Sequence, residues 1–247
     1  MVFSQFDALA HIYEEFSGLP FRQHLEFPSV RSLVGPAAEA RVLDLGCGSG
    51  VYSRWLAERP TASVTGLDES VGMIAYAARR EERERRGIDY VAGALPEALR
   101  GTFDLVVAVY VLPYATDYDE LVALCRVAGG ALRPGGRFLT LPLHPAFHPD
   151  PDYYAPYGFR LSEKGPREDG APVALNLRFN EHDTHVTARY WSAPTLERAL
   201  AEAGFTGIAW PAHQLSDEVA DDVAFFQPYL DVPHAAIIEA VKGVPSL

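Results

Sequence analysis

The fold of this chain is decided by Val42-Leu43-Asp44-Leu45-Gly46-Cys47-Gly48-Ser49-Gly50. An apolar strand runs directly into three alternate glycines, which adopt a positive φ at no steric cost and present no Cβ to a neighbouring molecule. A helix predicted over about 51–58 follows. The turn and the N-terminus of that helix can therefore lie against a nucleotide-like ligand.

The spacing of the glycines narrows the choice of ligand. A dinucleotide-binding turn needs G-x-G-x-x-G, but the last position is Val51 when counted from Gly46 and Ser53 when counted from Gly48. A phosphate-binding P-loop needs a lysine after its last glycine, and none follows here. NAD is thus disfavoured, and ATP binding through a P-loop is excluded.

An acidic residue lies about twenty positions after the turn. The pattern predicts a strand over 63–67 that ends at Asp68. A carboxylate in this place can accept hydrogen bonds from both hydroxyls of a ribose. Asp68 is alternatively a helix N-cap, but Ser70 can supply that cap. We therefore favour ribose binding.

Strands and helices alternate along the rest of the chain. Strands are expected near 41–45, 63–67, 88–92, 103–109 and 136–142, and a helix over Asp117–Leu132 ends at Arg133-Pro134-Gly135-Gly136. A helix near 194–203 and strands near 206–210 and 235–241 follow. This order predicts an α/β fold with a parallel, doubly wound sheet and ligands at the carboxyl ends of its strands.

These motifs together resemble those of the class I S-adenosylmethionine (SAM) methyltransferases. The resemblance rests on the glycine turn with Asp44, on Gly66–Met73, on Phe103–Tyr110 and on Leu132–Phe138. It implies a Rossmann-like seven-stranded sheet whose last strand is antiparallel. It also implies a single domain over 1–247, with an N-terminal helical segment 1–35 and a substrate lid inserted after the fifth strand at about 144–192.

The resemblance also implies SAM as the cofactor, with S-adenosylhomocysteine as its product and no metal. Ala94 stands where the family usually has an aspartate, so we expect adenine to rest on backbone groups at Gly93 and Ala94. Arg22 is a candidate partner for the methionine carboxylate. The expected cofactor-binding residues are Asp44, Gly46, Cys47, Gly48, Gly50, Asp68, Glu69, Gly93, Ala94, Ala108, Tyr13 and Arg22.

Within that family the chain resembles bacterial small-molecule methyltransferases of the toxoflavin (azapteridine) N-methyltransferase type. This similarity rests on Phe6–Tyr13, Tyr110–Ala115 and the aromatic block Asp152–Phe159. It implies methylation of nitrogen or oxygen in a small, flat heteroaromatic metabolite of bacterial secondary metabolism, such as antibiotic biosynthesis. A non-methylating reaction such as cyclisation, or non-catalytic SAM binding, remains an alternative. The expected substrate-binding residues are Tyr114, Tyr153, Tyr157, Tyr190 and Trp191, with core packing as the alternative for each.

Methyl transfer requires an aligned nucleophile, exclusion of water and removal of a proton. His144 and His148 follow the fifth strand and are the first candidates for the base, although each is alternatively a loop residue bonded to backbone. Tyr110, at the end of the fourth strand, is the third catalytic candidate. His182, Asp183 and His185 fall at the expected tip of a hairpin formed by 175–179 and 186–190, where a solvated turn is favoured.

Composition limits the classes of partner. The 247 residues carry a net charge of -12, which opposes binding to nucleic acid, and 48% of them are hydrophobic, enough for one sizeable domain. Base-methylating enzymes also have an Asn/Asp-Pro-Pro-aromatic run, where this chain has Ala108-Val109-Tyr110-Val111. Two cysteines give no disulfide framework, and we find no signal peptide or apolar membrane span. We therefore expect a cytoplasmic monomer or homodimer that acts on a small molecule, away from membranes.

Overall fold

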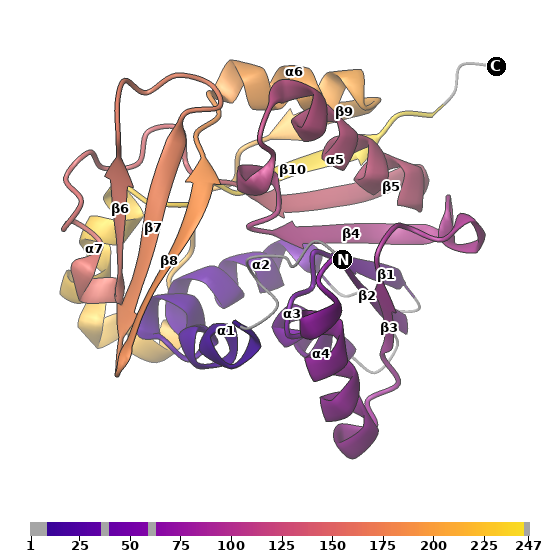
Figure 1. The fold of residues 1–247 in the computed structure, drawn as a ribbon, viewed down its shortest axis with the longest axis horizontal. Coiled ribbons are helices and arrows are strands. Elements are labelled where there is room, and N and C mark those ends of the chain that lie inside the picture. Colours follow the sequence, from indigo (N-terminus) through magenta and orange to yellow (C-terminus); the bar gives the residue numbers. More distant parts are fainter. Residues whose placement is uncertain (1–8, 36–39, 59–62, 245–247) are drawn as a thin grey trace.

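The structure is a computed structural model that describes residues 9–35, 40–58 and 63–244 (Figure 1). It begins with helix α1 (Ala10–Ser17), a π-helical turn at Arg22–Glu26 and helix α2 (Phe27–Val34). These helices occupy most of the expected N-terminal segment. Residues 1–8 of that segment lie outside the described ranges.

A seven-stranded sheet forms the centre of the molecule, with the strand order β3-β2-β1-β4-β5-β10-β9. Strands β1 to β5 pair in parallel, whereas β10 pairs antiparallel with both β5 and β9. The predicted α/β sheet with an antiparallel last strand is therefore confirmed. Its strands are β1 (Arg41–Leu45), β2 (Ser63–Asp68), β3 (Asp89–Ala92), β4 (Phe103–Val109), β5 (Leu132–Leu141), β9 (Phe205–Ala209) and β10 (Ile238–Lys242).

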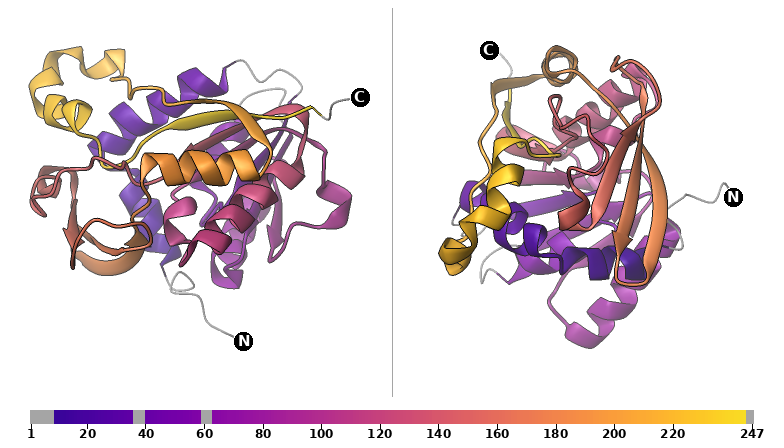
Figure 2. Two further views of the ribbon diagram at one scale, coloured as in Figure 1. Left: turned by 90° about the horizontal axis from the view of Figure 1, so that it is seen from above. Right: turned by 90° about the vertical axis from the view of Figure 1, so that its left-hand side faces the viewer.

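Helices cover both faces of this sheet (Figure 2). Side chains alternate along a strand, so Val106 and Ala108 pack under α5 (Tyr118–Ala131) and α6 (Ala193–Glu202). Leu105 and Val107 face the other way, toward α2 and α3 (Val51–Ala57). Helix α4 (Val71–Glu84) follows β2. The sheet is thus covered by helices on both faces, as the alternation of strands and helices in the sequence predicts.

Strand β5 begins earlier than the sequence pattern predicts. Helix α5 ends at Ala131 and β5 starts at Leu132, not near residue 136. The expected turn lies inside the strand, where Gly135 has a φ of +76°. The pairing of β4 with β5 shifts register between Phe103 and Leu105, and this irregularity accommodates the glycine.

The expected lid contains a second, antiparallel sheet of β6 (Phe159–Glu163), β7 (Pro172–Phe179) and β8 (His182–Arg189). The predicted hairpin is present, but only Asn180 and Glu181 separate its strands. Asn180 has a φ of +50°, which asparagine tolerates and which a two-residue hairpin turn requires. The placement of His182, Asp183 and His185 at the tip was therefore wrong, since all three lie in β8.

The small sheet stands at one end of the central sheet, beside α1 and α7 (Val223–Asp231) (Figure 1). It has its own hydrophobic cluster. Phe16 of α1, Phe21, Phe159 of β6, Leu177 of β7 and Tyr229 of α7 are all buried in it. The N-terminal segment, the lid and α7 therefore pack together through apolar and aromatic side chains.

Candidate functional site

The glycine turn follows β1 and leads into α3. Gly46, Gly48 and Gly50 have φ values of +67°, +55° and +84°, in the left-handed region that favours glycine. The amides of Gly46 and Cys47 donate to the carbonyl oxygen of Leu67 at 2.7 and 3.1 Å. The turn is thereby fixed to the carboxyl end of β2.

The three glycines have different surroundings. A Cβ on Gly46 would lie 2.4 Å from Cγ2 of Val111, and one on Gly50 would lie 2.3 Å from the hydroxyl oxygen of Tyr90. Among residues 9–35, 40–58 and 63–244, a Cβ on Gly48 would meet nothing closer than Sδ of Met73 at 4.0 Å. Gly46 and Gly50 are thus required by packing inside the protein, whereas Gly48 borders open space in which a ligand can lie.

Asp68 ends β2 beside this open space. Its Oδ2 accepts a hydrogen bond from the amide of Gly48 and its Oδ1 accepts one from the amide of Ser70, both at 2.8 Å. Ser70, not Asp68, caps α4, because its hydroxyl accepts from the amide of Met73 at 3.1 Å. A carboxylate can accept about four hydrogen bonds, so these two backbone contacts are compatible with ribose binding.

The adenine position lies on the same edge. Gly93 has a φ of +91° and donates its amide to the carbonyl oxygen of Asp68 at 2.9 Å. No atom of the described residues lies within 4 Å of a Cβ built on Gly93. Its neighbour Ala94 is exposed, as is Glu69 after β2. The open space beside Gly48 and the open space beside Gly93 therefore flank Asp68, as an adenosine group requires.

The expected cofactor residues Asp44, Cys47 and Ala108 have buried side chains. Asp44 accepts a hydrogen bond from the hydroxyl of Ser53 at 2.6 Å, and burial raises the pKa of Asp44 to about 7. Burial also raises the pKa of Cys47 well above its usual range, and Ala108 lies in the core under α5. The side chains of these residues support the turn and the sheet.

A small pocket lies at the carboxyl ends of β4 and β5. Its lining is almost entirely apolar and aromatic: Tyr13, Phe16, Tyr110, Pro113, Tyr114, Leu143, Leu175, Leu177, Ala188 and His234. The hydroxyls of Tyr13 and Tyr114 lie 3.5 Å apart. The amide of Tyr114 donates to the carbonyl oxygen of Val111, and the side chain of Val111 borders Gly46, so the pocket adjoins the glycine turn.

The pocket is closed in this conformation. Its cavity volume is about 30 Å³, close to the share of one molecule in liquid water. Tyr13 and Phe16 of α1 form one wall, and Leu175, Leu177 and Ala188 of the small sheet form another. A molecule larger than water can enter this cavity only if the side chains that line it move apart.

Arg22 and Tyr110 meet at a buried glutamate that the sequence analysis missed. Glu26 is fully buried and accepts hydrogen bonds from Nε of Arg22 at 2.8 Å, from the hydroxyl of Tyr52 at 2.6 Å and from the hydroxyl of Tyr110. This ion pair disfavours the expected role of Arg22 as partner of the methionine carboxylate. Burial and the charge of Glu26 raise the pKa of Tyr110 well above its usual range, so that its hydroxyl stays protonated.

Four of the five expected substrate residues lie away from the pocket, and only Tyr114 lines it. The hydroxyls of Tyr153 and Tyr157 donate to the carbonyl oxygens of Pro228 and Phe225, both at 2.7 Å. Tyr190 packs near the guanidinium of Arg167, and Trp191 lies in the core between α5 and α6. These four aromatic residues hold the lid together or fill the core.

The two candidate histidines lie in the loop after β5. Nδ1 of His144 accepts from the amide of Ala146 at 3.0 Å, and Nδ1 of His148 accepts from the amide of Asp150 at 3.1 Å. His148 also stacks on Tyr153, with ring centroids 3.9 Å apart. Neither histidine lines the pocket, but the amide of His144 donates to the carbonyl oxygen of His234 at 2.7 Å. His144 is thus one residue removed from the pocket wall.

Helix α1 connects the two sites. Glu14 forms ion pairs with Arg54 of α3 and with Arg80 of α4. The next residue, Glu15, pairs with His182 of β8 at 3.0 Å. One turn of α1 therefore contacts α3, α4 and the small sheet.

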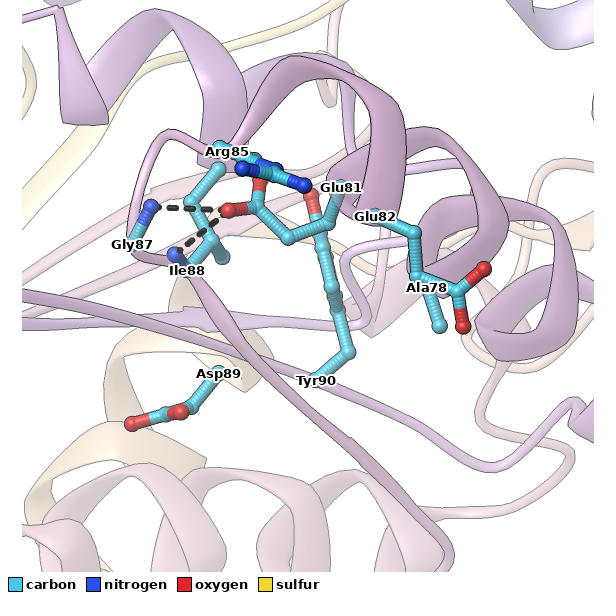
Figure 3. Close-up of a pocket in the computed structure, with 8 residues that line it drawn as sticks. All are labelled: Ala78, Glu81, Glu82, Arg85, Gly87, Ile88, Asp89 and Tyr90. Carbon is cyan, nitrogen blue, oxygen red and sulfur yellow. Dashed lines mark hydrogen bonds between the residues drawn. The ribbon is translucent and has the colours of Figure 1, made fainter.

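A second hollow lies where α4 meets β3, and Figure 3 shows the side chains that line it. Oε1 of Glu81 accepts hydrogen bonds from the amides of Gly87 and Ile88, at 2.7 and 3.3 Å. Glu81 therefore fixes the end of the helix to the start of the strand. We assign this hollow a structural role.

The described ranges contain neither a metal-binding cluster nor a membrane-spanning helix. Over residues 9–35, 40–58 and 63–244, no set of three or more His, Cys, Asp or Glu side chains is placed to hold a metal ion. Among the helices in the same ranges, none has both the length and the apolar character that a membrane span requires.

Comparison with known proteins extends these observations. Residues 42–136 match the model of a family described as a methyltransferase domain. Over 141 residues the chain is 30% identical to a ubiquinone biosynthesis O-methyltransferase of Pseudomonas aeruginosa. That alignment covers 54% of this chain and 59% of the relative, so the chain spans less than two thirds of the relative's length.

Solved structures share the fold over nearly the whole chain. A SAM-dependent methyltransferase from Mesorhizobium loti superposes with a TM-score of 0.62 at 22% identity, covering 92% of this chain and 100% of that one. The cyclase SpnF superposes with a TM-score of 0.60 at 18% identity, covering 97% and 95%. These likenesses confirm the fold class predicted from the sequence.

Proposed function

We propose that this protein transfers a methyl group from SAM to a small, flat heteroaromatic metabolite; the match of residues 42–136 to the methyltransferase-domain model and the shared fold support this proposal. The observation that carries the proposal is the open space beside Gly48 and Asp68, with the aromatic pocket next to it. In this proposal Asp68 holds the ribose, and Gly93 with Ala94 borders the adenine.

SAM supplies an already activated methyl group, so the protein needs no covalent nucleophile of its own. The chain's residues align the acceptor and exclude water. The rings of Tyr110 and Tyr114 line the pocket, and Leu143, Leu175 and Leu177 keep it apolar. These side chains suit a planar ring more than a flexible or charged chain.

Oxygen and nitrogen both remain possible methyl acceptors in this proposal. The curated relative is named an O-methyltransferase, which supports oxygen. The resemblance to the toxoflavin N-methyltransferase type supports nitrogen, along with a role in secondary metabolism. Cytoplasmic location, a single domain over the chain and a monomeric or dimeric state stay predictions.

Cyclisation is the second candidate function, since SpnF, named a cyclase, shares the fold. Titration calorimetry with SAM, S-adenosylhomocysteine and NADH tests the cofactor first: the two adenosyl ligands should bind and NADH should not. An acceptor screen by mass spectrometry then separates the reactions. A product heavier by one methyl group supports methyl transfer, and a product of unchanged mass supports cyclisation.

Asp68→Ala should weaken SAM binding by about 1.5 to 3 kcal/mol, because charge-assisted hydrogen bonds to the ribose are lost. Calorimetry measures the change. The exposed Asp89 of β3 offers a matched control, since Asp89→Ala removes a carboxylate from the neighbouring strand and should leave the affinity intact. Wild-type affinity in Asp68→Ala would remove the ribose role.

His144→Ala should lower turnover of an acceptor found in that screen more than His148→Ala does, about tenfold or more if His144 accepts the proton. His144 adjoins the pocket wall, whereas His148 stacks on Tyr153 outside it. Burial lowers the pKa of His144, so the imidazole is neutral and able to accept a proton near neutral pH. Unchanged turnover in both variants across neutral pH would show that neither histidine is the base.

A further inference from the structure

His234 is the one strongly polar side chain other than tyrosine in the pocket lining. It lies between α7 and β10 and is 4% exposed. Its ring centroid is 5.5 Å from that of Tyr110, with the two rings inclined by 35°. Because β10 runs antiparallel, the segment that leads into it lies at the same edge of the sheet as the carboxyl ends of β4 and β5, where Ala235 pairs with Leu143.

Tyr229 of α7 holds this imidazole. Its hydroxyl oxygen lies 2.7 Å from Nδ1 of His234, and its side chain is fully buried. Within the part of the chain that the structure describes, the hydroxyl has no second hydrogen-bond partner. Tyr229 is fully enclosed, so its hydroxyl proton can reach no acceptor but Nδ1, whereas His234 lines the pocket, where a ligand can meet a proton on Nε2. Because a buried donor without an acceptor is destabilising, Tyr229 donates to Nδ1. The neutral imidazole then carries its own proton on Nε2.

The surroundings keep the imidazole neutral. Burial lowers the pKa of His234 well below its usual range, and the charges of His213, Arg22 and His144 act in the same direction. Tyr110, Tyr154 and Tyr229 face it with their rings, and His213 packs against the ring of Tyr229. Arg22 is itself paired with Glu26. Tyr229 stays protonated, because burial and the charge of Glu26 raise its pKa well above its usual range.

The hydrogen bonding of the two ring nitrogens indicates that Nε2 of His234 is available to bind the acceptor. Over the described residues, no hydrogen bond is formed by Nε2 of His234, while Nδ1 is held by Tyr229. We propose, building on the methyltransferase function proposed above, that His234 donates a hydrogen bond from Nε2 to an oxygen of the acceptor. The acceptor class is then a flat ring that carries a carbonyl or phenolate oxygen.

This assignment limits what His234 can do. Nε2 already carries a proton and the lone pair of Nδ1 is occupied by the Tyr229 hydroxyl, so His234 does not accept the proton of the acceptor. The acceptor arrives as an anion or passes its proton to another group. His234 thus binds and orients the ring, and Tyr229 is a positioning residue that acts through it.

The tautomer can be measured without any substrate. Long-range proton–nitrogen NMR of the nitrogen-15-labelled protein distinguishes the two neutral forms of histidine, and the signals that vanish in His234→Gln identify the residue. We expect the proton on Nε2 in the wild type and a mixture of tautomers in Tyr229→Phe. A wild-type proton on Nδ1 would overturn the proposal, because Nε2 would then be a base.

The acceptor class is tested with two probes of equal shape, indanone and indane, in the presence of S-adenosylhomocysteine. The wild type should bind the ketone about fivefold more tightly than the hydrocarbon, as expected for one hydrogen bond. His234→Gln keeps an amide donor near the position of Nε2 and should retain this preference. His234→Leu removes the donor and should abolish it.

Each outcome bears on the proposal separately from the methyltransferase function. A ketone preference that survives in His234→Leu, or equal loss in both variants, overturns the donor role, as does failure of the wild type to bind either probe. SAM affinity, measured on the same samples, should be the same in all of them. Loss of SAM binding in the wild type would instead refute the proposed function.

Discussion

Replacing Gly48 by alanine is expected to weaken SAM binding more than a hundredfold, which corresponds to about 3 kcal/mol or more. Within the described part of the chain, a Cβ at this position meets no atom closer than Sδ of Met73 at 4.0 Å. The fold should therefore lose only about 1 kcal/mol, from holding alanine at a positive φ. The methyl group occupies the space in which we place the cofactor. Titration calorimetry measures the loss, and a thermal melt checks the fold.

Two other glycines serve as matched controls. Gly87 has a φ of +78° and no atom within 4 Å of a Cβ, so Gly87→Ala imposes similar backbone strain away from the turn and should bind SAM normally. Gly50→Ala should instead lower stability, because its Cβ would overlap the hydroxyl of Tyr90. Wild-type SAM affinity in Gly48→Ala would show that the cofactor does not lie against this turn.

Removing the Glu26 side chain should have the largest effect on stability. Glu26→Ala leaves the guanidinium of Arg22 buried without its carboxylate, where Arg22 is 4% exposed and Glu26 fully buried. Breaking a buried pair in this way costs about 3–5 kcal/mol. Urea denaturation measures the change in the free energy of unfolding.

A double variant tests whether the unpaired charge of Arg22 causes the loss of stability in Glu26→Ala. Arg22→Met with Glu26→Leu removes both charges and keeps apolar volume, so it should be at least about 2 kcal/mol more stable than Glu26→Ala. The hydroxyls of Tyr52 and Tyr110 lose their acceptor in both proteins, so this loss cancels in the comparison. Equal stabilities would mean that the buried charge of Arg22 is not the source of the cost.

The strands of the central sheet could be predicted because the residues that define each of them are close together in the sequence. Each strand of the parallel part is a short apolar run bounded by turn residues, and the glycine turn lies within nine consecutive positions. The start of β5 was misplaced because Pro134 and Gly135 usually end an element, whereas here a register shift absorbs them. The hairpin tip was misplaced because Asn180 makes a tighter turn than its polar neighbours suggest.

The acceptor pocket was harder to predict, because its lining comes from segments far apart in the sequence. Tyr153 and Tyr157 are aromatic residues that pack within the lid, and Trp191 packs into the core of the central sheet. The position of His234 could have been inferred from the sequence, because the segment that leads into an antiparallel last strand lies at the ligand edge of the sheet. Glu26 was also visible as the i+4 partner of Arg22 in an apolar stretch.

The contacts of α1 have a kinetic consequence. The same helix supplies Tyr13 and Phe16 to the acceptor pocket and Glu14 to the arginines of α3 and α4. Displacing it to admit a ligand at one site disturbs the other, so the two ligands do not enter independently. We expect an ordered sequence of binding, in which the cofactor enters first and the acceptor follows while α1 remains displaced. Because two of the contacts that hold α1 are ion pairs, the rate of entry should rise with ionic strength.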